Sequence, residues 1–296
     1  MVGGAGFLGS HLTERLLAEG HTVDVVDLLS SGSLANLSDA RSLGGELKIH
    51  TLDVCADEFH ALVAMRAPDV IYHLATLAPG VAAEQCAGES LRATLAVLEA
   101  ARSHGDVKVV VALSAVMLYG DVPSRDQPVK ESQPWNPVGV HGVITRSIAD
   151  LLGVYREQHS VEFTALALAN VYGSRQRADA GVVAAFAQAL REGTTPPMHG
   201  DGRQTRDFLY IDDAVDALVR AARKGSGLVV NIGTGVATSI RDLWALMAGP
   251  DARQPAPAPR RQNDVTRFAL SPTRARIHLA WAPWTELSTG LRGVRR

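Results

Sequence analysis

The chain has 296 residues, a formal net charge of −2 and only two cysteines, Cys55 and Cys86. This charge gives no electrostatic basis for binding nucleic acid or an anionic membrane surface, and no cysteine or histidine cluster has metal-ligand spacing. The apolar runs are too short to cross a bilayer, and the start lacks a signal-peptide pattern. We therefore expect a cytoplasmic globular protein without a metal site, with no nucleic-acid or membrane partner.

Apolar runs typical of β-strands alternate with helical periodicity over the first 170 residues. The expected strands are Thr22–Val26, Leu47–Thr51, Val70–Leu74, Val107–Leu113 and Phe163–Ala169. The expected helices are Ser10–Glu19, Phe59–Arg66, Glu89–His104 and Val143–His159, followed by Val182–Arg191 and Asp212–Lys224. The alternation predicts an α/β protein whose parallel sheet is covered by crossover helices. A Pro- and Ala-rich stretch at Pro250–Pro259 indicates a loop.

A glycine-rich loop, Gly3-Gly-Ala-Gly6-Phe-Leu-Gly9, comes before the first expected helix. Glycines let the backbone approach a pyrophosphate, whose charge the amino end of the helix stabilises. About 20 residues further on, a strand ends in Asp27, where a carboxylate can accept hydrogen bonds from ribose hydroxyls. Together the two features predict a dinucleotide site in a doubly wound Rossmann sheet.

The strand that should lead into this loop is short, because only Met1 and Val2 precede Gly3. Either the numbering begins inside a longer protein, or the first strand is truncated. The sequence leaves both possibilities open.

The chain resembles the nucleotide-sugar epimerase/dehydratase branch of the extended short-chain dehydrogenases. The motifs that carry the resemblance are the glycine loop with Ser10-His-Leu, Leu52-Asp-Val, His73-Leu-Ala-Thr76, Tyr119-Gly-Asp, Asn170-Val-Tyr-Gly, the segment Gly200–Phe208 and Asn231-Ile-Gly-Thr-Gly. This resemblance implies a Rossmann domain of residues 1–169, to which residues 207–235 return. Residues 170–206 and 236–296 would form a smaller C-terminal substrate-binding subdomain.

The same resemblance implies a nicotinamide cofactor, NADH or NADPH. Asp27 favours NADH because it would repel a 2′-phosphate, whereas the serines that follow it could bind one. The residues expected to hold the cofactor are Gly3, Gly6, Phe7, Leu8, Asp27, Ser31, Asp53, Val54, Leu74, Ala75, Thr76, Ser114 and Asn170.

The proton-transfer residues of the family are replaced in this chain. The family uses a Ser or Thr, a Tyr and a Lys, and the matching positions here hold Ala115, His141 and Thr145. Ser114 stands one place before the serine position, and the chain contains no Tyr-x-x-x-Lys. Ser114 and His141 are the candidate catalytic residues, and His141 is as easily a helix-start residue that lines the pocket.

On the substrate side, Arg206 and Arg261 match positions that clamp a nucleotide diphosphate in the family, and arginine suits that task because it binds oxyanions bidentately. The arginine of the family's Arg-Tyr-Phe-Asn run is replaced, since the segment here is Ala167-Leu-Ala-Asn170. The predicted substrate contacts are Thr76, Tyr119, Trp135, His141, Arg206 and Arg261.

The cofactor site is present, but the usual proton donors are missing. We therefore predict a ketoreductase whose substrate supplies the proton. A phenol next to an aryl ketone could do this. In this the chain is similar to the triad-less angucyclinone ketoreductases of aromatic polyketide antibiotic pathways. One alternative is a nucleotide-sugar epimerase, dehydratase or ketoreductase that uses His141 as its acid. Another is a non-catalytic NAD(P) sensor. Each of the enzyme hypotheses implies a small-molecule partner. The sequence does not distinguish a monomer from a homodimer.

Overall fold

The computed structural model describes residues 1–75, 83–249, 253–261 and 264–294. Its α-helices are α1 Phe7–Ala18, α2 Ser38–Ser42, α3 Asp57–Arg66, α4 Ala83–His104, α5 Ala115–Tyr119, α6 Gly139–His159, α7 Val182–Glu192, α8 Ile211–Ala221, α9 Ile240–Ala248, α10 Thr273–Leu279 and α11 Leu287–Val294. Its strands are β1 Val23–Asp27, β2 Leu47–Thr51, β3 Val70–His73, β4 Lys108–Ser114, β5 Phe163–Leu168, β6 Asn170–Tyr172, β7 Pro197–His199, β8 Thr205–Arg206, β9 Phe208–Tyr210, β10 Leu228–Ile232, β11 Thr238–Ser239 and β12 Ala256–Ala258.

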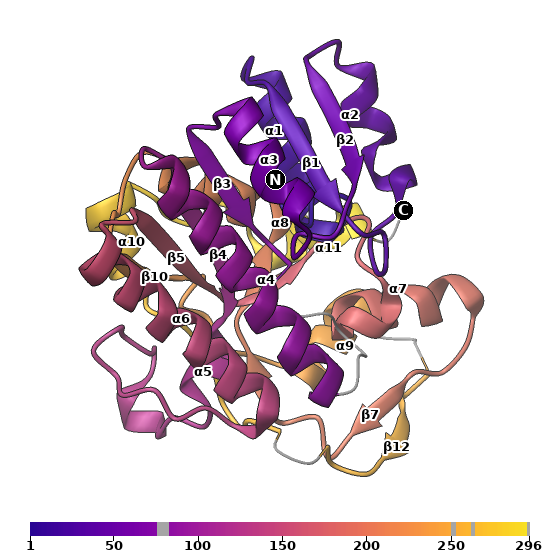
Figure 1. Ribbon diagram of the computed structural model, residues 1–296. Helices are drawn as coiled ribbons and strands as arrows, with labels where there is room; N and C mark the ends of the chain where they lie inside the picture. The colour runs from indigo at the N-terminus through magenta and orange to yellow at the C-terminus, as the bar shows by residue number, and fades with distance from the viewer. Residues whose placement is uncertain (76–82, 250–252, 262–263, 295–296) are drawn as a thin grey trace.

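The main sheet is parallel throughout and confirms the predicted Rossmann fold. On one side β2 pairs with β1, and on the other the order is β3, β4, β5 and β10 (Figure 1). Val2 joins the two parts, because it bridges Val26 of β1 and His73 of β3. The inner strands are apolar runs because helices cover both of their faces, as in other parallel sheets.

Two layers of helices cover the sheet. Leu12 of α1 and Leu218 of α8 belong to the hydrophobic core on one face. Phe59 of α3, Val97 of α4 and Ile148 of α6 belong to the core on the other. The two layers leave the carboxyl ends of the strands, where the loops of a ligand site gather in this type of sheet, free of covering helices.

A third hydrophobic cluster lies between α7 and α9. Phe186 packs edge-on against Trp244, with 5.0 Å between the ring centroids, and Tyr172 and Leu291 complete the cluster. These residues come from the last two-fifths of the chain, where the sequence pattern was less regular. Here β12 forms inside the stretch predicted to be a loop, because it pairs with β7 from another part of the chain.

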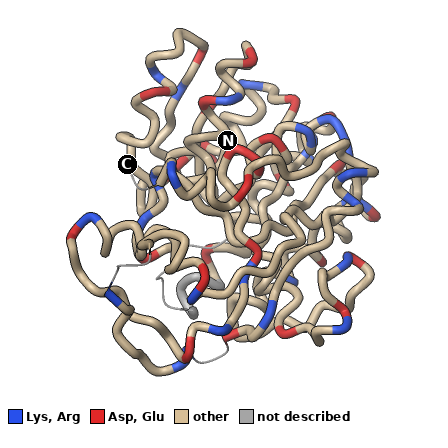
Figure 2. Tube along the Cα trace, turned by 180° about the vertical axis from the view of Figure 1, so that it is seen from behind, with Lys and Arg blue, Asp and Glu red and all other residues tan. Residues whose placement is uncertain are grey.

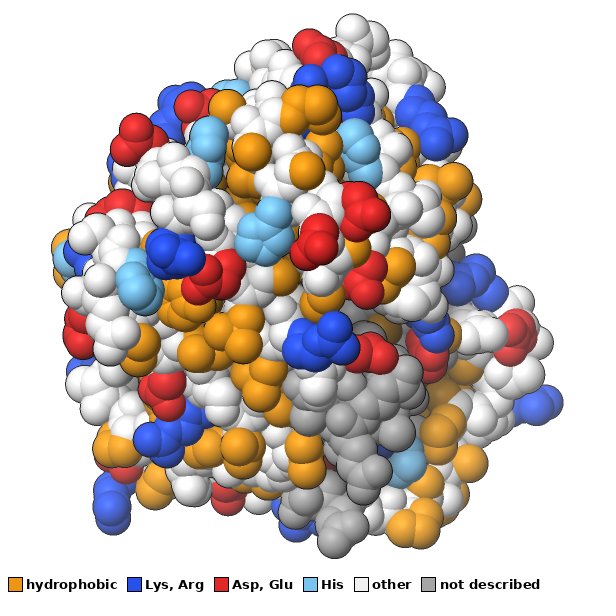
Figure 3. Space-filling model, in the orientation of Figure 1, with side chains coloured by type: hydrophobic (Ala, Val, Ile, Leu, Met, Phe, Trp, Pro, Cys, Tyr) orange, Lys and Arg blue, Asp and Glu red, His pale blue; other side chains and the backbone are white. Residues whose placement is uncertain are grey.

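Charged residues of both signs are distributed over the whole fold, as the tube in Figure 2 shows. Apolar side chains gather on the face formed by α4 and α6 in Figure 3, where Leu95, Val143 and Val154 are exposed. Among the described residues, no helix is both long and apolar enough to cross a membrane.

Asp207 joins the later part of the chain to the sheet. Its fully buried carboxylate accepts hydrogen bonds from the N–H groups of Thr234, Gly235 and Leu270, at 2.9, 3.1 and 3.0 Å, and from the Thr234 hydroxyl at 2.6 Å. Burial nevertheless raises the pKa of Asp207. The Asp207 side chain thus attaches two segments to the strand pair β6–β9. One is the loop after β10, with Thr234 and Gly235, and the other is the segment that contains Leu270.

Replacing Asp207 with alanine should lower the free energy of unfolding by about 3 kcal/mol or more, because several buried donors lose their acceptor. Urea unfolding measures this loss. Asp201→Ala is the control, since Asp201 is exposed and its carboxylate accepts from the Arg203 N–H and pairs with the Arg203 guanidinium, both in its own turn. Equal stability of the two variants would contradict the role given to Asp207.

Candidate functional site

The glycine loop packs tightly against the ends of two strands. Gly3 has a φ of +80°, and a Cβ added there would lie 3.0 Å from the backbone nitrogen of Ala75. A Cβ on Gly9 would come within 2.2 Å of the Gly3 carbonyl oxygen. Both positions therefore require glycine, which lets α1 begin close to the sheet.

The amino end of α1 is open to an anion. Its N-cap, Gly6, provides no side-chain hydrogen bond, and the first turn of the helix contains no acidic residue. The first N–H groups of a helix lack intrahelical partners and carry partial positive charge. A Cβ on Gly6 would meet only the Gly3 carbonyl oxygen, at 3.4 Å, so a larger side chain would extend into the adjoining cleft. These features fit the pyrophosphate of a dinucleotide.

Asp27 stands where the ribose site is expected, at the end of β1. Its carboxylate accepts hydrogen bonds from the N–H groups of Ala5 at 2.9 Å and Leu29 at 2.8 Å. Each carboxylate oxygen accepts one of these bonds and keeps a further lone pair for a ligand hydroxyl. Asp27 therefore fixes the glycine loop and can still take part in the predicted ribose contact.

A cleft of about 310 Å³ opens beside this loop, at the carboxyl ends of β4 and β5. It brings together five residues of the predicted cofactor set, Gly6, Phe7, Leu8, Ser31 and Ser114. It is also lined by residues that were not predicted, among them Asn36, Ala169, Arg175 and Gln176. This position matches the ligand crevice of open parallel sheets.

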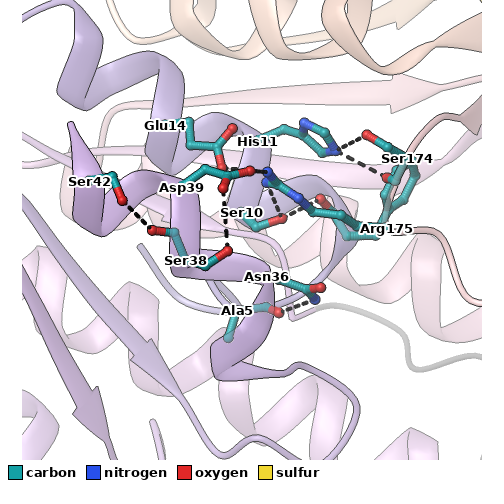
Figure 4. A network of polar contacts seen from close by, with 11 residues as sticks. Ala5, Ser10, His11, Glu14, Asn36, Ser38, Asp39, Ser42, Ser174 and Arg175 are labelled. Carbon is teal, nitrogen blue, oxygen red and sulfur yellow. Dashed lines mark hydrogen bonds and ion pairs between the residues drawn. The ribbon is translucent and has the colours of Figure 1, made fainter. Parts of the chain in front are cut away.

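Arg175 anchors the loop after β6 to the glycine helix (Figure 4). Its guanidinium pairs with Glu14 of α1 at 2.6 Å and with Asp39 of α2 at 2.8 Å, and it donates to the Ser10 hydroxyl at 3.4 Å. His11 lies 3.1 Å from the Ser174 carbonyl oxygen, and burial lowers the pKa of this histidine. The sequence signal for this network was the continuation of the Asn170 motif into Ser174-Arg-Gln.

The other predicted cofactor residues lie at or near the same edge of the sheet. The Asp53 carboxylate accepts from the Cys55 N–H at 2.9 Å, and Val54 is buried in the core. Leu74 is partly buried against the first core, and the Asn170 N–H donates to the Asp207 carbonyl oxygen at 2.9 Å. Thr76 lies outside the described residues. The ligand contacts of these residues remain predictions.

The residues predicted to stand at the family's proton-transfer positions differ in their access to solvent and ligand. Ala115 is fully buried, and so is Thr145, whose hydroxyl donates to the His141 carbonyl oxygen at 2.8 Å. A threonine held in this way can neither reach a ligand nor supply the positive charge of a lysine. Ser114 and His141 are only half-buried, which leaves them as the two candidates with access to solvent or ligand.

Ser114 and His141 lie on neighbouring elements. Ser114 ends β4 and is the N-cap residue of α5, without a side-chain capping bond. The first turn of α6, which contains His141, packs on α5, since a Cβ on Gly142 would lie 2.7 Å from the Met117 carbonyl oxygen. The fold therefore brings both side chains to the same end of the sheet.

Two of the predicted substrate contacts, Tyr119 and Arg206, are held by partners within the fold. Tyr119 is fully buried and donates to the Asn231 side-chain oxygen at 2.9 Å, and burial raises its pKa to about 12. The Arg206 side chain is 11% exposed, pairs with Asp264 and donates to two carbonyl oxygens, each at 2.7 Å. Burial lowers the pKa of Arg206. Both motifs thus stabilise the fold around the site.

The remaining substrate predictions are still open. Arg261 is exposed, and Trp135 is partly buried against both main cores. Their ligand contacts remain predictions. Among the described residues, no group of histidine, cysteine or carboxylate side chains could hold a metal ion.

Comparison with known proteins gives matches over nearly the whole chain. A model of the NAD dependent epimerase/dehydratase family matches residues 1–233. The chain is 37% identical to a UDP-glucose 4-epimerase of Mycolicibacterium smegmatis, over 98% of this chain and 95% of the relative. It is 28% identical to a dTDP-glucose 4,6-dehydratase of Streptomyces griseus, over 98% of this chain and 90% of the relative.

Solved structures give the same result. A Thermotoga maritima UDP-glucose 4-epimerase with UDP-glucose superposes with a TM-score of 0.91 at 31% identity, covering 99% of this chain and 96% of the other. A Thermus thermophilus UDP-glucose 4-epimerase in complex with NAD gives 0.87 at 29% identity, with the same coverage. The predicted nicotinamide cofactor is confirmed at the level of the family. These relatives support the nucleotide-sugar alternative better than the aromatic-ketone prediction.

Replacing Gly6 with valine should weaken NAD binding by roughly 100-fold or more, because a branched side chain would fill the space that a pyrophosphate needs. Isothermal titration measures the affinity, and circular dichroism checks the fold. Gly153→Val in α6 is the control, since a Cβ there meets no atom within 4 Å. A folded Gly6→Val protein with unchanged affinity would show that the pyrophosphate does not bind at this loop.

Proposed function

Because the chain belongs to the NAD-dependent epimerase/dehydratase family, we propose that it catalyses an oxidation–reduction at a carbon of a nucleotide-linked sugar, with His141 as the proton-transfer residue. The observation that carries this proposal is the position of His141. It lies in the first turn of α6, half-buried, against the helix that follows Ser114, while Ala115 and Thr145 are buried.

Residues that line the cleft and residues on the elements around it would divide the binding and the chemistry between them. The glycine loop and the amino end of α1 hold the pyrophosphate, and Asp27 accepts from ribose hydroxyls. When bound, the nicotinamide group supplies or accepts the hydride. Ser114 can donate a hydrogen bond to the substrate oxygen. A ring nitrogen of His141 gives a proton to that oxygen during reduction or takes it during oxidation, which an imidazole can do near neutral pH.

Residues 170–206 and 236–296 would hold the rest of the substrate. The cluster of Phe186 and Trp244 gives this region a core of its own, and Asp207 and Arg206 attach it to the sheet. The relatives whose names contain UDP-glucose or dTDP-glucose support a nucleoside diphosphate as the recognised group. Arg261, exposed on this lobe, is a candidate for its phosphates.

An aromatic ketone is the second candidate substrate, favoured by the apolar wall of the cleft. Leu113, Leu168 and Ala169 line it where the strands end. Such a surface suits a flat, apolar ring system, and a phenol next to the ketone could replace the missing tyrosine. Hydride would add to the carbonyl carbon, the phenol proton would pass to the carbonyl oxygen, and water would reprotonate the phenolate. This is the chemistry of the angucyclinone ketoreductase type.

The two substrates can be separated by binding. UDP or dTDP at millimolar concentration, with NAD present, should raise the melting temperature if the proposal is correct, because a ligand that binds only the folded state stabilises it. Stabilisation by aromatic ketones alone would favour the second candidate. Stabilisation by neither, together with tight NAD binding and no hydride transfer to any ketone tried, would favour a non-catalytic sensor.

Replacing His141 with glutamine should lower kcat by roughly 100-fold with little change in KM, the usual scale for losing a general acid or base. The readout is the NADH absorbance of a single turnover. His159→Gln, at the exposed far end of the same helix, is the control and should keep full activity. A His141→Gln enzyme with normal kcat would exclude the histidine as the proton donor.

The substrate-assisted route has its own test. Methylating the phenol beside the ketone removes the proton and leaves the carbonyl in place, so the reduction rate should fall by roughly 1,000-fold as the oxyanion charge goes uncompensated. Binding of the methyl ether is measured separately, because a clash would imitate the effect. Tight binding with an unchanged rate would exclude assistance by the phenol.

A further inference from the structure

Arg175 joins two walls of the cleft that come from distant parts of the chain. One wall contains the glycine loop with Ser31 and Asn36, and the other contains Arg175 and Gln176 of the β6–α7 segment, residues 173–181. The Arg175 side chain crosses from its own wall to α1 and α2, the helices that adjoin the first wall (Figure 4). Because the β6–α7 segment begins the proposed substrate-binding subdomain, Arg175 connects that subdomain to the cofactor edge of the sheet.

The two ion pairs of Arg175 differ in their exposure to water. The side chains of Arg175 and Glu14, paired at 2.6 Å, are 17% and 22% exposed. The side chain of Asp39, paired with the same guanidinium at 2.8 Å, is 74% exposed. Water and salt screen an exposed pair more than a half-buried one. Glu14 is therefore the stronger partner of Arg175, and the pair with Asp39 is the one that salt weakens.

A second tether lies beside the first. The Nε2 atom of His11 in α1 is 3.1 Å from the Ser174 carbonyl oxygen and 3.3 Å from the Ser174 hydroxyl. The His11 ring also packs edge-on against Phe7, which lines the cleft, with 5.9 Å between the ring centroids. Two successive residues of the β6–α7 segment, Ser174 and Arg175, are thus attached to α1.

The backbone at Arg175 is held in an unfavourable conformation. Its φ is +64°, in the left-handed region that residues other than glycine seldom occupy. A residue keeps such a conformation only when its surroundings fix it. The side-chain pairs with α1 and α2 contribute to this restraint. Loss of the pairs would therefore let residue 175 relax and shift its wall of the cleft.

We propose that Arg175 is a latch that holds the two walls together around the bound cofactor and thereby sets how fast NAD leaves the cleft. The proposal rests on the cofactor part of the proposed function, the pyrophosphate at the amino end of α1, and is independent of the sugar chemistry. NAD between the walls leaves when the β6–α7 segment separates from α1, and this separation requires the pairs of Arg175 to break. Arg175 is thus a positioning residue that acts through the two walls.

The rate of NADH release tests the latch without any sugar present. Protein loaded with NADH is mixed with excess NAD in a stopped-flow instrument, and the change in NADH fluorescence gives the dissociation rate. Arg175→Met should raise this rate by roughly tenfold or more, because it keeps most of the side chain's bulk and removes both ion pairs. Glu14→Gln should raise it by roughly fivefold. Asp39→Asn should raise it by roughly twofold, since its pair is exposed.

Circular dichroism checks the fold of each variant, and Asp39→Asn, at an exposed position, keeps the test available if the others unfold. Release rates equal to that of the unchanged protein in folded Arg175→Met and Asp39→Asn would overturn the latch. The placement of the pyrophosphate is tested separately by Gly6→Val. Weakened binding in Gly6→Val together with unchanged release in Arg175→Met would therefore overturn the latch alone.

Asp179→Asn is the matched control. Asp179 lies on the same β6–α7 segment and pairs at 2.6 Å with Arg177, a partner within that segment. The variant removes one negative charge, as Glu14→Gln does, but the ion pair that it breaks does not cross to the other wall. Its release rate should equal that of the unchanged protein. An increase as large as that of Glu14→Gln would overturn the proposal, because the charge around the cleft would then control release.

A double-mutant cycle tests whether Glu14 acts through Arg175. In protein that already carries Arg175→Met, adding Glu14→Gln should change the release rate by less than about twofold, because the partner of the carboxylate is gone. The same fivefold increase in both backgrounds would show that Glu14 acts without Arg175, and it would overturn the latch.

Ionic strength gives a readout that a general loosening of the fold would not move. Raising the salt concentration from roughly 0.05 M to roughly 0.5 M should speed release from the unchanged protein more than from Asp39→Asn, because only the former has the exposed pair to lose. The comparison cancels the salt dependence of NAD binding itself, which both proteins share. Equal salt responses would overturn the part of the latch assigned to Asp39.

Discussion

The contact of Gly3 with the backbone of Ala75 is the constraint on which the rest of the site depends. It brings the glycine loop to the end of β3 and sets where α1 begins, so that the amino end of the helix faces the cleft. Asp27 holds the same loop from the other side through the Ala5 N–H. Backbone contacts and one carboxylate therefore fix the position of the loop at the cofactor edge of the sheet.

Several polar residues of the motifs near the carboxyl ends of the strands make hydrogen bonds and ion pairs within the fold. Asp207 receives four hydrogen bonds, and Arg206 is bonded to Asp264 and to two carbonyl oxygens. The loop carrying Arg175 is attached to α1 through Glu14 and Ser10. Buried polar groups of this kind stabilise the structure only when they are fully paired. They position the walls of the cleft and leave its ligand contacts to less buried side chains.

The proposed chemistry rests on the residues that we expect at the family's hydroxyl, phenol and ammonium positions. Thr145 bonds to its own helix and Ala115 has no polar atom, so neither position can move a proton. His141 is the one of the three that carries a titratable group, and it is half-buried in the first turn of α6. A single imidazole can serve as acid or base. It cannot at the same time supply the separate positive charge that the family's lysine adds beside the proton donor.

The sequence alone determined the Rossmann fold and a dinucleotide site at the glycine loop and Asp27, because these features depend on local patterns, namely the alternation of strands and helices and the spacing of glycines. The nicotinamide cofactor followed from the resemblance to a known family. The sequence also located the inner strands to within one or two residues. Only the tertiary structure decided that Tyr119 and Arg206 are buried and paired, that Arg175 belongs to the cleft wall, and that β12 forms within a Pro-rich stretch. A motif gives the type of residue but not its partners, which come from segments far away in the chain.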